Sequence, residues 1–173
     1  MLKQSFNFHF YQKGLPVKQR VLAMFLTLLG SGLSAKAPGT IGSLFALGLW
    51  YLSGLHTVSL VLQVFSALFM LAIGYLACLI YEKQSQEKNK DNQCIVIDEA
   101  AGMWIALIAM PEKWWVYILV FVLFRVFDIV KLFPCDYFDR NMKNAAGIML
   151  DDVVAGIYAN TSAYILISFL KWM

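Results

Sequence analysis

The sequence predicts an all-α, polytopic integral membrane protein, a helical bundle in which some helices are short or broken near the candidate active site. Two observations support this prediction. Hydrophobic residues make up 60% of the 173 residues and charged residues only 14%, and the mean hydropathy of +0.65 is too high for a soluble domain of this length. Several apolar runs are also long enough to cross a bilayer as helices. Residues 1–173 are therefore expected to form one membrane-embedded domain.

The N-terminal part of the chain is expected to remain outside the bilayer. Residues 1–20 are basic and mixed in composition, which predicts a cytoplasmic arm. The alternative is a signal peptide with an Ala-Lys-Ala cleavage site at residues 35–37. A signal peptide rarely begins with so long and mixed a stretch, so the arm is the preferred interpretation.

Five apolar segments follow the arm. Residues 58–81, 114–133 and 148–172 are long enough to cross the membrane. Residues 43–55 and 99–110 are shorter, and they either are extended by their neighbours or enter the membrane as broken or re-entrant helices. The polar residues 82–97 form the linker in the middle of the chain.

Lysine and arginine residues set the expected orientation. They gather before the first span, in the linker and around Pro134, so these three regions are expected in the cytoplasm. If both short segments cross, the N-terminus lies inside and the C-terminus outside. The net charge of +3 is explained by this topology and gives no indication of a nucleic-acid partner. Three cysteines without a CxxC spacing indicate neither a disulfide framework nor a zinc ribbon.

Four polar motifs then fall at the cytoplasmic ends of helices: "APGTIGS", "VIDEAAG", "RVFDIVK" and "MLDDVV". Carboxylates gathered in this way repel one another unless a cation lies among them. Because the candidate ligands are oxygen atoms, the expected ion is Mg²⁺, with Mn²⁺ as a substitute. The candidate catalytic residues are Asp98, Glu99, Asp128, Asp151 and Asp152, and all of these except Asp98 are candidate metal ligands.

The first motif and several basic residues indicate a phosphate site. Backbone N–H groups at a glycine-rich helix start carry a partial positive charge that suits phosphate. The candidate phosphate-binding residues are Lys36, Gly39, Thr40, Arg125, Lys131 and Arg140. Metal-binding carboxylates beside such a site at a membrane surface predict phosphomonoester chemistry on a lipid headgroup.

Four ordered blocks resemble the signature of the phosphatidylglycerophosphatase A family: "GSGLSAKAPGTIGS", "IVIDEAAGMWIAL", "FRVFDIVKLFPCDYFDRN" and "GIMLDDVVAG". The resemblance implies a Mg²⁺-dependent enzyme of the bacterial inner membrane. It would act on the phospholipid phosphatidylglycerophosphate, among membrane lipids, and leave phosphatidylglycerol. By position, the resemblance carries over Thr40, Asp98, Glu99, Arg125, Asp128, Lys131, Asp139, Arg140, Asp151 and Asp152. One departure is that Leu132 and Phe133 separate Lys131 from Pro134, where the family often has a Lys-Pro pair.

Other phosphatase chemistries do not fit the residues. Cys135 and Arg140 are separated by four residues rather than the five that a cysteine phosphatase needs, and no Asp-x-Asp occurs. The chain has two histidines, His9 and His56, and His56 is expected at the opposite face. A divalent-cation transporter and a non-catalytic scaffold remain as alternative functions.

Each motif also has a purely structural interpretation. Both acidic pairs could cap helices, Arg125 and Asp128 could form a structural ion pair, and the glycines around Thr40 could form only a turn. The sequence leaves open the number of metal ions, the nucleophile, the general base, the selectivity among lipid phosphates and the oligomeric state.

Overall fold

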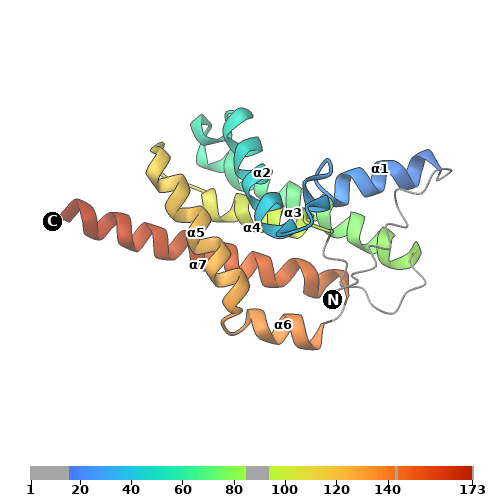
Figure 1. Ribbon diagram of the computed structural model, residues 1–173. Helices are drawn as coiled ribbons and strands as arrows, with labels where there is room; N and C mark the ends of the chain where they lie inside the picture. The colour runs from blue at the N-terminus through green and yellow to red at the C-terminus, as the bar shows by residue number, and fades with distance from the viewer. Residues whose placement is uncertain (1–15, 85–93, 143, 173) are drawn as a thin grey trace.

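The computed structural model describes residues 16–84, 94–142 and 144–172, and every regular element in these residues is a helix (Figure 1). This confirms the all-α prediction. The α-helices are α1 (Val17–Leu26), α2 (Pro38–Leu52), α3 (Leu60–Gln84), α4 (Ile97–Leu107), α5 (Trp114–Val130), α6 (Cys135–Asn141) and α7 (Ala145–Trp172). Short 3₁₀ turns, Ser31–Leu33 and Leu55–Thr57, flank α2.

Two of these helices are long and apolar enough to cross a membrane, Leu60–Gln84 and Ala145–Leu170. They correspond to two of the three long spans expected from the sequence. The third, α5, has 17 residues and ends at Val130, because Lys131 adopts a left-handed conformation with φ of 49°. The last residues of the expected span therefore leave the helix and lead into α6.

Several helix boundaries differ from the expected ones. Helix α1 overlaps the arm predicted over residues 1–20 and the apolar stretch behind it. Helix α2 begins at Pro38, five residues before the predicted start, because proline is well suited to the first helical position. The linker predicted over residues 82–97 loses both ends to α3 and α4, and its residues 85–93 lie outside the described residues.

Helices α2, α4 and α7 run in the same direction. Trp104 Nε1 of α4 donates a hydrogen bond to the Ala46 carbonyl of α2 at 3.0 Å, further along both helices than the contact between Gly39 and Glu99 in their first turns. Along α7, Gly102 lies against the backbone of Asp152, and Asn160 reaches Ala106 further on. The N-terminal ends of α2, α4 and α7 therefore lie at one end of the molecule, together with the C-terminal end of the oppositely directed α5.

Helix α4 is the centre of the assembly and packs closely on α7 (Figure 1). A Cβ atom on Gly102 would meet the Asp152 backbone carbonyl, and one on Gly156 would meet the carbonyl oxygen of Gly102. Buried alanines continue the contact along both helices. Small residues allow two backbones to approach in this way, as is common between membrane helices. This approach places the acidic start of α4 directly beside the acidic turn of α7.

Helix α4 ends far short of a full crossing. Its 11 residues span about 16 Å, roughly half of the hydrocarbon core. Polar side chains from the two long helices bind its end: Asn160 Nδ2 donates to the carbonyls of Ala106 at 3.0 Å and Ile108 at 2.8 Å. Gln63 Oε1 accepts a hydrogen bond from the Ala109 N–H at 2.9 Å. The helix end can therefore remain among apolar side chains without leaving these backbone groups unpaired.

We expect Asn160→Ala to lower the stability of the detergent-solubilised protein by about 1–2 kcal/mol, because two backbone carbonyls lose their donor. Thermal unfolding measures this change. Thr161→Ala, at an exposed position on the same helix, is the control and should leave the midpoint unchanged. Equal midpoints for the two variants would contradict this account of the α4 end.

Candidate active site

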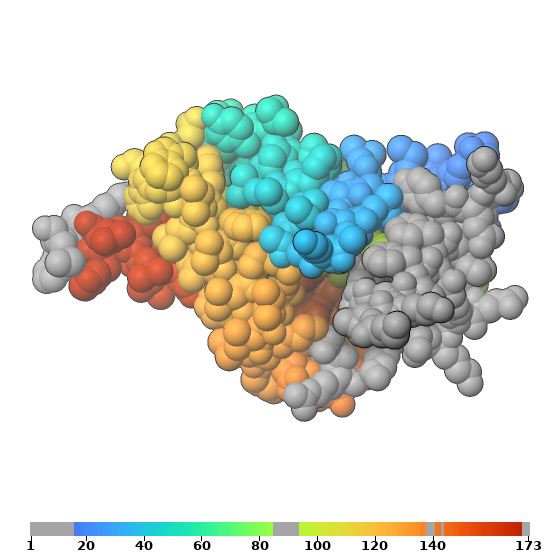
Figure 2. Space-filling model, viewed as in Figure 1, coloured from blue at the N-terminus to red at the C-terminus, as the bar shows by residue number. Residues whose placement is uncertain are grey.

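The polar motifs of four helices meet at one end of the bundle. Their side chains are connected by contacts between α2 and α5, within α4, and between α5 and α7. In the space-filling view the surfaces of α2 and α5 adjoin on one face of the molecule (Figure 2). The residues brought together are Gly39, Ser43, Asp98, Glu99, Arg125, Asp128, Lys131, Asp151 and Asp152.

Three carboxylates form the centre of this group. One oxygen from each of Asp98, Glu99 and Asp152 lies within 4.8 Å of the others. Asp98 and Glu99 belong to the first turn of α4, and Asp152 is only 3% exposed on α7. Within the described residues, Asp98 Oδ1 and Glu99 Oε2 are buried without a hydrogen-bond partner. Negative charges this close and this buried require a cation or protonation.

Two cationic side chains bind the remaining carboxylates. Arg125 Nη1 lies 2.7 Å from Asp128 Oδ2, three residues later on α5. Lys131 Nζ lies 3.2 Å from Asp151 Oδ2 and so connects the end of α5 to α7. Asp128 and Asp151 therefore each have a basic partner in an ion pair.

The first turn of α2 lies against both kinds of group. A Cβ atom at Gly39 would overlap Glu99 Oε1 and would lie 3.1 and 3.2 Å from the terminal nitrogens of Arg125. Only glycine leaves room for this approach. The N-cap residue, Ala37, has no side chain that could bind the first N–H groups of the helix. These N–H groups and Arg125 together provide the positive potential of the site.

The central carboxylates fit a hard divalent cation. All three offer oxygen ligands, which Mg²⁺ prefers, and two of their oxygens lack any partner among the described residues. The group differs from the ligand set expected from the sequence, because it contains Asp98 while Asp128 and Asp151 bind basic side chains. Asp98, Glu99 and Asp152 are thus the residues that could hold the ion.

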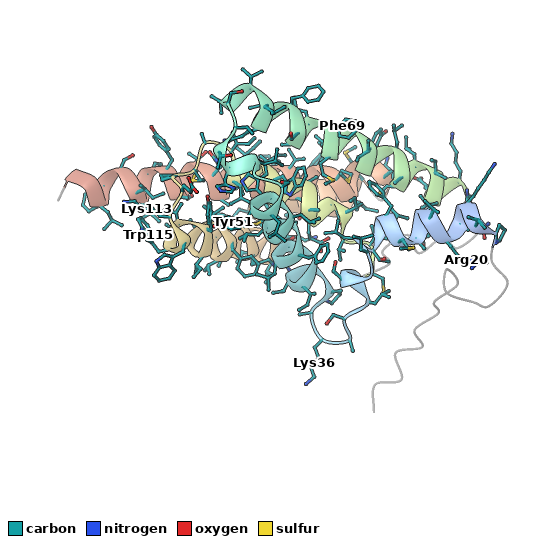
Figure 3. All side chains as sticks on the ribbon, turned by 90° about the horizontal axis from the view of Figure 1, so that it is seen from above. Arg20, Lys36, Tyr51, Phe69, Lys113 and Trp115 are labelled. Atoms are coloured by element: carbon teal, nitrogen blue, oxygen red, sulfur yellow. The ribbon has the colours of Figure 1, made fainter. Side chains whose placement is uncertain are left out.

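Other candidate residues lie at the edge of the site or away from it. Thr40 is half-buried in the first turn of α2. Lys36 is exposed on the preceding loop, and its side chain points away from the helices (Figure 3). The side chains of Asp139 and Arg140 lie outside the described residues. Ser43, which sequence reasoning did not select, contacts Arg125. Its spacing of four residues from Gly39 was the available signal, because such residues share a helix face.

The helix-cap interpretation fails for Asp151 and Asp152. Helix α7 begins at Ala145, so both residues lie well inside it rather than at its start. Asn144 Oδ1 and Glu82 Oε2 instead accept hydrogen bonds from the N–H groups of Gly147 and Ala145, each at 3.0 Å. Asp98 and Glu99 do occupy a first turn, where the helix dipole favours negative charge.

His56 lies at the other end of the helices. Its Nε2 is 3.2 Å from Glu112 Oε1, and its ring stacks on Tyr51 at 4.6 Å between centroids. Tyr51 belongs to the last turn of α2, whose first turn contacts the carboxylates. The structure therefore places this histidine away from the acidic site, as expected from the sequence.

A family model and two relatives carry the same name. The family model described as Phosphatidylglycerophosphatase A matches residues 24–167. The chain is 42% identical over 129 residues to Phosphatidylglycerophosphatase A of Escherichia coli (strain K12), covering 74% of this chain and 73% of the relative. It is 45% identical over 134 residues to the Haemophilus influenzae protein of the same name, covering 75% and 78% of the two chains.

A third relative carries a different name. The chain is 37% identical over 151 residues to a Bacteroides thetaiotaomicron protein named as a candidate phosphatidylinositol-3-phosphatase, covering 85% of this chain and 91% of the relative. No solved structure matches the chain significantly. Both names denote phosphatases whose substrates are phosphorylated lipids.

We expect Gly39→Ala to lower turnover at least tenfold, because the added methyl group must displace Glu99 or Arg125. Gly48→Ala is the matched control on the same helix, since a Cβ there has no neighbour within 4 Å. The control should keep full activity and gain up to about 1 kcal/mol of stability from helix propensity. Equal activity of both variants would show that the close approach at Gly39 has no role in turnover.

The cysteines are expected to be dispensable. Cys94 and Cys135 are buried, and burial raises the pKa of both thiols, which disfavours the reactive thiolate. Cys94→Ser and Cys135→Ser should therefore retain turnover when corrected for the amount of folded protein. Loss of turnover in a folded Cys135→Ser protein would support a thiol mechanism instead.

Proposed function

The chain belongs to the phosphatidylglycerophosphatase A family, and from this premise we propose that it removes the terminal phosphate of phosphatidylglycerophosphate. The products are phosphatidylglycerol and inorganic phosphate. The proposed cofactor is Mg²⁺, and the proposed location is the cytoplasmic face of a bacterial inner membrane. The observation that carries this proposal is the group of three carboxylates, Asp152 buried and Asp98 and Glu99 half-buried, beside Arg125 and the first turn of α2.

The carboxylates explain how a metal ion would be held. Asp98, Glu99 and Asp152 supply three oxygens to one point from two closely packed helices. A divalent cation bound there would neutralise charge on the transferred phosphoryl group. The rigid contact between α4 and α7 keeps the three carboxylates together although their charges repel.

Arg125 is the proposed phosphate-binding side chain. Its guanidinium lies between Asp128, Ser43 and Gly39, so its position is determined before substrate enters. A guanidinium offers paired N–H donors that match two phosphoryl oxygens. Lys131, at the end of α5, adds positive charge toward the headgroup region while it binds Asp151.

Hydrolysis forms a bond between a water oxygen and phosphorus as the ester bond to the glycerol oxygen breaks. The proton lost by the water is balanced by the proton gained by the departing alcohol. The protein's part is to hold the phosphoryl group against Arg125 and the N-terminus of α2, and to exclude bulk water by burial. Positioned positive charge of this kind lowers the barrier to phosphoryl transfer.

The helix surfaces support a membrane location. Large apolar side chains project outward from the long helices, including Val61 at 79% exposure and Leu170 at 60%. Such continuous apolar surface favours contact with lipid rather than water. The distribution of lysine and arginine favours a cytoplasmic position for the end that carries the site. A headgroup phosphate would then meet the carboxylates at the membrane surface.

Phosphate release from phosphatidylglycerophosphate in detergent micelles, with the purified protein, tests the proposal. We expect release with Mg²⁺ and at least a hundredfold slower release with a chelator. Phosphatidate and phosphatidylinositol 3-phosphate are the comparison substrates, because the named relatives differ in their lipids. The absence of release from phosphatidylglycerophosphate with Mg²⁺ would contradict the proposed activity.

We expect Asp98→Asn, Glu99→Gln and Asp152→Asn to lower turnover by at least a hundredfold. Without metal, each variant should be as stable as the wild type or more stable, since one buried charge is removed. The stabilisation by Mg²⁺ in thermal unfolding should decrease in each, which gives a measurement independent of activity. Glu112→Gln, at the opposite end, is the control.

One threshold in turnover distinguishes a catalytic role of the three carboxylates from a structural role. Turnover within about threefold of wild type in all three variants corresponds to less than 1 kcal/mol of barrier. Such a result, with an unchanged Mg²⁺ effect on unfolding, would mean that the carboxylates have a structural role only.

A further inference from the structure

We propose that Ser43 is a positioning residue that holds the Arg125 guanidinium against the first turn of α2. The inference rests on the proposed function, because it assigns to Ser43 a role in presenting Arg125 to the phosphate. Ser43 itself would touch neither the substrate nor the metal.

The Ser43 hydroxyl connects two parts of the site. The side chain is completely buried, with 0% exposure. Its Oγ–H donates to the carbonyl of Gly39 at 2.7 Å, and its Oγ accepts a hydrogen bond from Arg125 Nη1 at 3.2 Å. Because a hydroxyl has one proton, donation to Gly39 leaves the oxygen lone pairs toward the arginine. The first turn of α2 and the guanidinium are therefore joined through a single atom.

This contact determines which donors of Arg125 remain for a ligand. Nη1 has two hydrogens, and its two acceptors are Ser43 Oγ and Asp128 Oδ2. Nε is buried without a hydrogen-bond partner among the described residues, and both terminal nitrogens lie beside Gly39, where Glu99 Oε1 also lies. The edge of the guanidinium formed by Nε and Nη2 therefore faces neither Ser43 Oγ nor Asp128 Oδ2. Two parallel N–H groups on such an edge suit two oxygens of a phosphate.

A role in helix stability alone does not explain this serine. A serine that bonds to the carbonyl four residues earlier is neutral or slightly unfavourable within a helix. Alanine would fill the buried position with better helix propensity. The hydroxyl is explained by Arg125, because the second Nη1 hydrogen of the buried guanidinium needs an acceptor.

The first test is Ser43→Ala, with inorganic phosphate as the probe of the site. We expect kcat/KM to fall about tenfold, as for loss of one hydrogen bond to a charged group, and the inhibition constant of phosphate to rise by a similar factor. The thermal midpoint should fall only slightly, because Arg125 keeps its ion pair with Asp128 and alanine has the better helix propensity. Ser53→Ala is the matched control, because Ser53 Oγ also donates to a carbonyl of α2, that of Trp50 at 3.0 Å, at the far end. It should match the wild type.

The second test is a double-mutant cycle with Arg125→Lys, followed by calorimetric binding of inorganic phosphate in the presence of Mg²⁺. A lysine has no second edge to orient, so Ser43→Ala should cause no further loss in the Arg125→Lys background. An equal loss in both backgrounds would show that Ser43 acts independently of Arg125 and would overturn the inference.

Two further outcomes would also overturn it. Wild-type kcat/KM and phosphate inhibition in Ser43→Ala would show that the contact has no role, and a lowered midpoint with unchanged phosphate binding would show a structural role only. Neither outcome affects the proposed function. That proposal depends on whether the wild-type protein releases phosphate from phosphatidylglycerophosphate.

Discussion

The close burial of carboxylates at one end of an apolar bundle is the constraint that the rest of this structure must satisfy. Asp98, Glu99 and Asp152 lie within one small space, where their charges repel and water is scarce. The fold compensates with the N-terminal ends of α2 and α4 and with the basic end of α5. Each contributes positive potential to the same point. The direction of every helix around the site is consistent with this requirement.

Helix α4 is short, and its packing on α7 places its acidic turn beside that of α7. Its close packing through Gly102 and Gly156 fixes the register between the helices, and Asn160 and Gln63 bind its buried end. The polar residues inside the long helices therefore have a structural purpose. Gln63 is a strongly polar residue within the apolar helix α3, and its hydrogen bond to the end of α4 accounts for it. Residues far from the acidic site thus support its geometry.

Membership in the phosphatidylglycerophosphatase A family gives this arrangement a chemical interpretation. A lipid phosphate is anionic, so a group of carboxylates can bind it only together with a cation and with donors such as Arg125. The structure separates these tasks: in the described part of the chain Asp98, Glu99 and Asp152 gather around one point, while Asp128 and Asp151 bind Arg125 and Lys131. The names of the relatives differ in the lipid, but each name describes the removal of a phosphate from a lipid.

The sequence by itself determined the helical class, the family and most residues of the acidic site. Apolar runs and short polar motifs are local patterns, so they can be recognised from the sequence alone. The sequence also selected Arg125 and Lys131, because their spacing along the chain is a local property. Only the tertiary structure decided which carboxylates share a point and which bind cations, since these pairings join residues distant in the chain. The start of α7 excluded a capping role for Asp151 and Asp152, and the contact between α2 and α5 revealed Ser43. Such facts depend on how helices pack, and packing is set by contacts that no single segment encodes.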